Sequence, residues 1–286
     1  MVGGNCLRYF KEKSHDVTGT HLSFPLEGTV YFNSVNRADP ANIDIADFNP
    51  EIIVHCGALT NVDYCEDHPS ESYDRTVVSA HNIAAIARQV GARVIYLSTD
   101  YVFDGQSGPY VESDQVNPLN IYGKHKLEAE RLILNQSSTN IIIRVTNVYG
   151  DELRGKNFIS RIVTSIRKNE NVQISLPFDQ FATPVNAYDI AKVIHQLLLN
   201  QSTGIYHIGS TDYYSRVQLF KKILEYFPRY NNYEIKVFST SELNQPAPRP
   251  LRGGLLPLKF LLENPEFEFT NVDTYLKKIQ ITESAV

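Results

Sequence analysis

Short apolar runs alternate with amphipathic segments along most of this chain. The apolar runs, which are typical of parallel strands buried on both faces, occupy residues 50–56, 94–97, 140–145 and 204–209. The amphipathic segments, in which apolar residues recur at helical spacing, occupy residues 70–90, 122–135, 157–168 and 186–199. Strands that alternate with helices are typical of βαβ units. The pattern therefore predicts an α/β fold with a Rossmann-type, doubly wound parallel sheet.

The first residues depart from that pattern. Gly3-Gly4 leads directly into an amphipathic helix pattern, and a short strand is expected at residues 16–21. A Rossmann unit begins with a strand, followed by a glycine-rich turn and a helix. Here the turn comes first, so we expect the first strand and the start of the glycine turn to be missing. A flexible start is the alternative interpretation of the glycine pair.

The alternation predicts two domains. We expect a dinucleotide-binding Rossmann domain at residues 1–150, to which residues 182–206 return, and a smaller C-terminal substrate-binding lobe formed by residues 151–181 and 207–286. Four prolines between Pro246 and Pro257, together with Gly253-Gly254, predict a long surface loop. A substrate cleft is expected between the two domains.

Composition and charge exclude several functions. The 286 residues are 42% hydrophobic and 21% charged, which allows a sizeable core. The 27 basic and 32 acidic residues give a net charge of −5 with no basic run, so we expect no nucleic-acid partner. No apolar run approaches transmembrane length and no signal pattern opens the chain, so no membrane association is expected. Three cysteines without metal spacing indicate reduced thiols in the cytoplasm.

The candidate chemistry lies between residues 94 and 126. The predicted strand at 94–97 is followed by Ser98-Thr99-Asp100, at the carboxyl end, where open α/β sheets bind ligands. Tyr122 and Lys126 follow with i,i+4 spacing, which places both on one face of a helix. An ammonium beside a phenol lowers the pKa of the phenol, as a tyrosine general acid requires near pH 7.

Several segments together resemble one family. They are YLSTDYVFDG (96–105), PLNIYGKHKLEAE (118–130), RVTNVYG (144–150), DQFATPVNA (179–187) and APRP (247–250). With these, nearly the whole chain resembles the dTDP-4-dehydrorhamnose reductase branch of the extended short-chain dehydrogenases/reductases, to which the regulatory β subunit of methionine adenosyltransferase is related. The resemblance implies a cytoplasmic oxidoreductase that uses NADP(H) or NAD(H) to reduce the 4-keto group of a nucleotide-linked 6-deoxy sugar, in dTDP-L-rhamnose synthesis.

The resemblance also implies roles for individual residues. The catalytic residues it implies are Thr99, Tyr122 and Lys126. The cofactor-binding residues it implies are Gly3, Asp44, Ile45, Gly57, Ala58, Leu59, Ser98, Tyr122 and Lys126. The substrate-binding residues it implies are Asp100, Tyr101, Phe103 and Arg249. Thr76 and Ser79 depart from the family pattern, which usually has asparagine and glycine at these positions.

Two other functions stay open. One is a cofactor-binding regulatory subunit without turnover, of the methionine adenosyltransferase β type, and the other is a nucleotide-sugar epimerase or dehydratase. After the second strand, His21-Leu22-Ser23 has neither the acid that selects NAD nor an arginine that selects NADP. The family sometimes uses Mg²⁺ at a dimer contact, and a homodimer is expected on the same ground, but no residues here indicate a metal site.

Overall fold

A four-stranded parallel sheet forms the centre of the larger lobe in the computed structural model, which describes residues 1–284. Its strands, in spatial order, are β3 (Ile52–His55), β4 (Arg93–Thr99), β5 (Ile141–Val145) and β8 (Gly204–Ile208). The middle strands are almost entirely buried, which explains their continuous apolar sequences. The predicted α/β class with a parallel sheet is confirmed.

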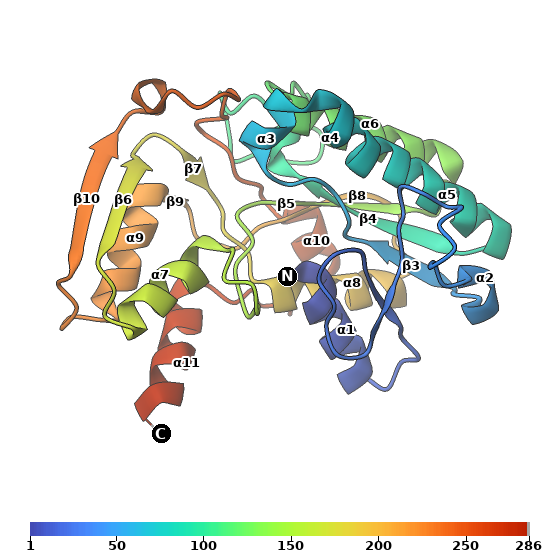
Figure 1. Ribbon diagram of the computed structural model, residues 1–286, viewed down its shortest axis with the longest axis horizontal. Coiled ribbons are helices and arrows are strands. Elements are labelled where there is room, and N and C mark those ends of the chain that lie inside the picture. The colour runs from blue at the N-terminus through green and yellow to red at the C-terminus, as the bar shows by residue number, and fades with distance from the viewer. Residues whose placement is uncertain (285–286) are drawn as a thin grey trace.

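Helices cover both faces of this sheet (Figure 1). One face carries α3 (Val62–Asp67), α4 (Pro69–Tyr73), α5 (Ser79–Val90) and α6 (Ile121–Gln136). The other carries α1 (Val2–Glu12), α8 (Ala187–Leu199) and α10 (Leu258–Glu263). Each face has its own hydrophobic core: alanines and isoleucines of α5 and α6 pack against β4 on one side, and α1 and α8 pack against β5 and β8 on the other. Burial of these apolar stripes is what fixes the layers.

The smaller lobe lies beside the carboxyl ends of the strands of that sheet (Figure 1). Its elements are α7 (Phe158–Arg167), β6 (Val172–Pro177), α9 (Arg216–Glu225), β10 (Tyr233–Phe238) and α11 (Val272–Ser284). β6 pairs in parallel with β10, and the three helices share an apolar core built around Phe220 and Leu276. A short antiparallel pair, β7 (Phe181–Ala182) with β9 (Tyr214–Ser215), lies at the junction of the lobes. The division into two domains with the predicted boundaries stays our proposal.

The amino-terminal strands form a separate pair. β1 (Gly19–His21) and β2 (Thr29–Tyr31) bond in parallel to each other and not to the four-stranded sheet. The short α2 (Ile45–Phe48) follows them. α1 begins at Val2, so the glycine pair lies in the first helical turn rather than in a flexible start.

Two segments differ from the sequence expectation. Residues 61–69 carry no strand or helix prediction, but Asn61 accepts a hydrogen bond from the Tyr64 amide and so caps α3. The predicted helix at 70–90 is interrupted by a π-helical turn, η1 (Asp74–Val78), between α4 and α5.

The proline-rich segment is not a surface loop. Leu255 is fully buried, and its neighbours Arg252 and Leu256 donate backbone hydrogen bonds to Gly105 and Tyr110. Gly253 donates another to Phe181, at the junction with the smaller lobe. The segment therefore joins the lobes, because its backbone donors find partners in both.

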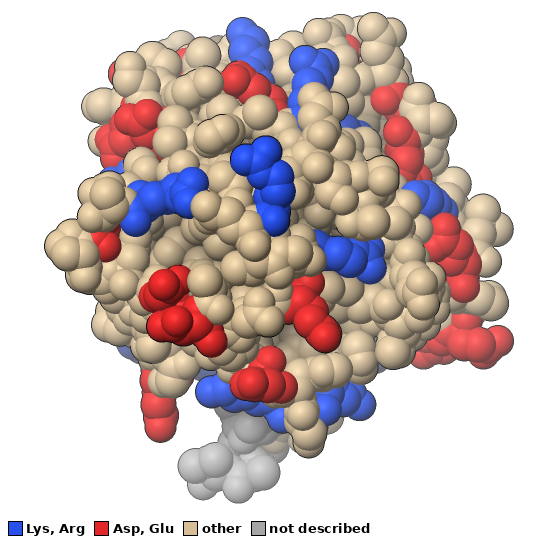
Figure 2. Space-filling view, turned by 90° about the vertical axis from the view of Figure 1, so that its right-hand side faces the viewer, with Lys and Arg blue, Asp and Glu red and all other residues tan. Residues whose placement is uncertain are grey.

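Acidic and basic side chains are interspersed over the face of the molecule that Figure 2 shows. No helix among the described residues is both long and apolar enough to cross a bilayer. Within residues 1–284, we also find no cluster of three or more His, Cys, Asp or Glu side chains that could hold a metal ion.

Candidate active site

The carboxyl end of β4 and the first turns of α6 form the centre of the candidate site. Asn120 caps α6, because its side-chain oxygen accepts a 2.9 Å hydrogen bond from the Gly123 amide. The helix approaches the η2 turn (Asp100–Val102) so closely that a Cβ on Gly123 would lie 2.2 Å from the Tyr101 carbonyl oxygen. Only glycine permits this approach, which brings the next residues of α6 against β4.

Tyr122 and Thr99 meet at this point. The Thr99 hydroxyl lies close enough to the Tyr122 phenol to lower its pKa, and the Tyr122 ring lies edge-on to Tyr101 with 5.6 Å between centroids. Burial raises the pKa of Tyr122 well above its ordinary value, and this effect is larger than that of Thr99. The phenol is therefore neutral and can donate a proton.

Lys126 lies one turn further along α6 and is almost fully buried. Its ammonium donates a hydrogen bond to the Leu97 carbonyl and lies 4.1 Å from the centroid of the Tyr96 ring. Burial lowers the pKa of Lys126 to about 7. Among the described residues, no carboxylate lies within ion-pair distance of this ammonium. A buried cation without a counter-ion is costly and is characteristic of functional sites.

The expected lowering of the Tyr122 pKa by Lys126 is wrong for this structure. The ammonium points to the Leu97 carbonyl, so it does not offset the desolvation of the phenol. Spacing placed both residues on one helix face correctly, but desolvation is the larger effect on the phenol.

The unsatisfied polar atoms around Lys126 fit a ribose–nicotinamide group. The hydroxyls of Ser98, Tyr96 and Thr76 are buried without a hydrogen-bond partner. Hydroxyl groups of a ribose can satisfy such donors and acceptors, and buried polar groups are otherwise almost always paired. The residues present at this end of β4 therefore fit the predicted dinucleotide.

The first turn of α1 offers an anion site at the end of β3. A Cβ on Gly3 would lie 3.8 Å from the Cys56 side chain, so the helix start faces the strand end closely. Free amide groups and the helix dipole attract phosphate at such a position. Gly57, Ala58 and Leu59 follow β3 here, and the three cysteines of the chain are free thiols.

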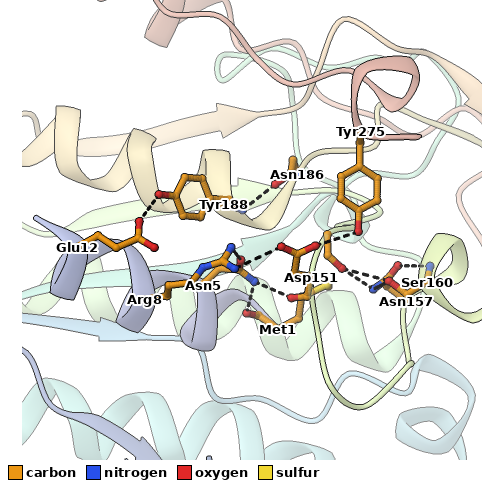
Figure 3. Close-up of polar contacts among 11 residues, drawn as sticks. Met1, Asn5, Arg8, Glu12, Asp151, Asn157, Ser160, Asn186, Tyr188 and Tyr275 are labelled. Carbon is orange, nitrogen blue, oxygen red and sulfur yellow. Dashed lines mark hydrogen bonds and ion pairs between the residues drawn. The ribbon is translucent and has the colours of Figure 1, made fainter. Parts of the chain in front are cut away.

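Polar contacts hold α1 against the loop that follows β5 (Figure 3). The buried Asn5 side chain donates 3.0 Å hydrogen bonds to the carbonyls of Met1 and Asp151. Arg8 pairs with the Asp151 carboxylate at 3.3 Å, and Tyr275 donates to that carboxylate from the smaller lobe. The helix that carries Gly3 is thus fixed relative to both lobes.

The other predicted residues lie in three places. Asp44 is exposed and caps α2 by accepting from the Ala46 amide at 2.8 Å, with Ile45 as the first helical residue; their adenine-side role stays a prediction. Phe103 is fully buried and stacks on Tyr110 at 4.2 Å, which gives it a packing role. Asp100 and Tyr101 lie at the junction of the lobes.

Asp100 and Tyr101 line a small cleft there. Asn147 from the end of β5, Arg216 from α9 and Pro250 also line it. The Asp100 carboxylate accepts hydrogen bonds from the Thr146 hydroxyl at 2.7 Å and from the Gly254 amide at 3.2 Å. Burial raises the pKa of Asp100, although these hydrogen bonds oppose the effect.

Arg249 does not line this cleft but forms an ion pair with Asp63, 2.7 Å apart, and its side chain is only 8% exposed. Arg216 does line it. Sequence reasoning missed Arg216, because it opens an ordinary helix pattern and no motif marks it.

Another hollow lies elsewhere. It has a volume of about 430 Å³ and is lined by Ser70, Tyr73, Asp74 and His125, with Pro69. It contains none of the predicted site residues, and His125 is bonded to Ser72 at 2.8 Å. This open hollow lies over α4 and the outer side of α6 and is separate from the candidate chemistry.

Comparisons with known proteins agree with this geometry. The family model described as RmlD substrate binding domain matches residues 1–277. The chain is 33% identical over 226 residues to the Xenopus laevis protein named methionine adenosyltransferase 2 subunit beta, which covers 77% of this chain and 67% of that protein. It is 31% identical over 221 residues to the dTDP-4-dehydrorhamnose reductase of Sinorhizobium fredii, covering 74% of this chain and 73% of that protein.

A solved structure shares the fold. The dTDP-4-dehydrorhamnose reductase of Bacillus anthracis, crystallised in complex with NADP, matches with a TM-score of 0.78 and 24% identity. The match covers 98% of this chain and 96% of that chain. At this identity, the likeness establishes the fold and leaves the activity to the site residues.

Proposed function

We propose that this chain, which belongs to the RmlD substrate-binding domain family, is an NADP(H)- or NAD(H)-dependent reductase of a nucleotide-linked sugar. The substrate we propose is a 4-keto-6-deoxy sugar, as in dTDP-L-rhamnose synthesis. The observation that carries the proposal is the cluster of Thr99, Tyr122 and Lys126 at the carboxyl end of β4, in which Thr99 and Lys126 are buried and Tyr122 is half-buried. The Sinorhizobium fredii reductase, at 31% identity, supports the choice of reaction.

The chain's own residues supply proton donation and orientation. A reduced nicotinamide, when bound, supplies hydride. Tyr122 is a neutral phenol and donates its proton to the oxygen of the reduced carbon. Thr99, whose hydroxyl lies near the Tyr122 phenol, orients the same oxygen. Lys126, which donates one hydrogen bond to the Leu97 carbonyl, would offer its other N–H donors to ribose hydroxyls.

Cofactor binding would use three further regions. The first turn of α1 with Gly3 would hold the pyrophosphate, and residues 57–59 would lie along the cofactor. Ser98 would donate its unpaired hydroxyl to the nicotinamide side. Asp44 and Ile45 would contact the adenine side.

The test is oxidation of NADPH and of NADH in the presence of dTDP-4-dehydrorhamnose or its UDP analogue. Tyr122→Phe should lower kcat at least ~100-fold, the usual effect of removing a general acid. Tyr73→Phe, which removes an exposed phenol bonded to Glu128, is the matched control and should leave kcat unchanged. Normal turnover by Tyr122→Phe would exclude the proposed mechanism.

A second candidate is a non-catalytic subunit. The relative at 33% identity is named as a subunit of methionine adenosyltransferase, and Lys126 points to the Leu97 carbonyl rather than to Tyr122. A stable complex with a methionine adenosyltransferase catalytic subunit, together with nucleotide binding and no turnover, would favour this function. Turnover that depends on Tyr122 would exclude it.

A further inference from the structure

Two arginines of the cleft region differ sharply in how their charges are used. Arg249, in the APRP segment, is paired with Asp63 at 2.7 Å and also donates to the Ala247 carbonyl at 3.1 Å. Asp63 accepts a further hydrogen bond from the Ala247 amide. The charge of Arg249 is therefore already balanced, and its contacts hold the loop in place.

Arg216 has no such balance. Its guanidinium donates a hydrogen bond to the Asn147 side-chain oxygen at 2.8 Å and lies over the Phe158 ring at 5.4 Å. Within residues 1–284 no carboxylate lies within ion-pair distance of it. Asp100 faces it, but Thr146 and the Gly254 amide already use one oxygen of that carboxylate.

The charged groups that act on Arg216 are Asp100, Arg161 and Arg249. Burial lowers the pKa of Arg216, because a buried guanidinium loses its hydration. Of these three arginines only Arg216 lines the cleft, and its planar guanidinium can donate two hydrogen bonds to a phosphate.

The cleft also adjoins the proton donor. Tyr101 lines the cleft together with Arg216, and its ring contacts the ring of Tyr122. An anionic group bound at Arg216 would therefore lie beside the sugar that reacts at Tyr122.

We propose that Arg216 binds the diphosphate of a nucleoside diphosphate sugar, whereas Arg249 only positions the Ala247–Pro250 loop through Asp63. This inference rests on the proposed function and names the residue that recognises its substrate. The cleft measures about 20 Å³, room for about one water, so a diphosphate would require the cleft to widen. It would take the place of Asn147 as the hydrogen-bond partner of Arg216.

The experiment is calorimetric titration of the full chain with dTDP and with UDP. Arg216→Gln should weaken binding at least ~10-fold, the loss expected for a charge-assisted hydrogen bond. Arg216→Lys keeps the charge but loses the planar guanidinium, so its affinity for the diphosphate should lie between those of Arg216→Gln and wild type. This variant also tests the assignment if Arg216→Gln fails to fold. Arg229→Gln, an exposed arginine between α9 and β10, is the matched control and should bind as wild type.

Arg249→Gln should weaken binding less than Arg216→Gln. Three results would each overturn the assignment. They are wild-type affinity for the diphosphate in folded Arg216→Gln, a larger loss of affinity in Arg249→Gln than in Arg216→Gln, and no diphosphate binding by the folded wild-type chain. Turnover with an unchanged KM in Arg216→Gln would overturn it and leave the reductase standing. Diphosphate binding that depends on Arg216, without turnover by wild type or any variant, would support the assignment of Arg216 and exclude the proposed reductase activity.

Discussion

The Lys126 ammonium lies 4.1 Å from the centre of the Tyr96 ring, in a site where burial lowers its pKa to about 7. A cation over an aromatic face gains some electrostatic stabilisation, but less than water provides. The lysine therefore remains partly deprotonated near neutral pH, and its titration should be measurable in the stability of the protein.

We expect Lys126→Met to remove a pH dependence of stability. The pKa of Lys126 is 10.5 in an ordinary environment and about 7 in the fold, so the unfolded chain binds more protons between pH 7 and 10. The free energy of unfolding should therefore rise with pH across this window, by at most about 5 kcal/mol at about 1.4 kcal/mol per pKa unit. Urea unfolding at several pH values measures it, and parallel profiles for wild type and Lys126→Met would contradict the prediction.

The buried Arg144–Glu130 pair should be sensitive to loss of one partner. Its atoms lie 2.7 Å apart, and both side chains are at most 3% exposed. Arg144→Met leaves a buried carboxylate without its cation and should cost about 3–5 kcal/mol. The exposed Arg75–Glu71 pair is the matched control, and Arg75→Met should cost less than about 1 kcal/mol. Equal losses, measured by chemical denaturation, would show that burial does not decide the effect.

Gly123→Ala should disturb the site through the backbone. The new Cβ would lie 2.2 Å from the Tyr101 carbonyl, which forces α6 away from η2. We expect a loss of about 1–3 kcal/mol in stability and a lower kcat. Gly3→Ala is the contrast: its Cβ meets Cys56 at an ordinary 3.8 Å, and alanine in a helix should add about 0.5–1 kcal/mol. Thermal unfolding of both variants checks the opposite signs.

The contacts in Figure 3 should differ in how much they contribute to the free energy of unfolding. Asn5 is buried and donates two hydrogen bonds, so Asn5→Ala should cost about 1–3 kcal/mol. Arg8 is about half exposed and pairs with the exposed Asp151 carboxylate, so Arg8→Ala should cost less than about 1 kcal/mol. Denaturant midpoints of the two variants compare them directly, and a greater loss in Arg8→Ala would reverse this ranking.

The sequence predicted the central elements well because the pattern of hydrophobic residues within each element indicates whether it is a strand or a helix. The continuous apolar runs of β4 and β5 indicated strands buried on both faces, and the helix pattern at residues 122–135 placed Tyr122 and Lys126 on one helix face. The family resemblance, confirmed by the match over residues 1–277, added the grouping of Thr99 with Tyr122. These features depend on the spacing of residues along the chain, which is visible in the sequence itself.

Other features depended on contacts between distant segments. The proline-rich stretch was predicted to be a surface loop. Backbone hydrogen bonds from Arg252 and Leu256 to the larger lobe instead hold it between the lobes. The raised pKa of Tyr122 also has no local cause, because desolvation comes from everything packed around the phenol.

The two arginines of the cleft region illustrate the same division. Sequence by itself determined the parallel α/β scaffold and the positions of the tyrosine and lysine on one helix face, since backbone periodicity and motif spacing are encoded along the chain. Only the tertiary structure decided that Asp63 neutralises Arg249, while Arg216 lines the cleft with no carboxylate of residues 1–284 within ion-pair distance. The reason is physical: whether a charge is free depends on what lies within about 4 Å of it in space, and those neighbours come from segments far apart in the sequence.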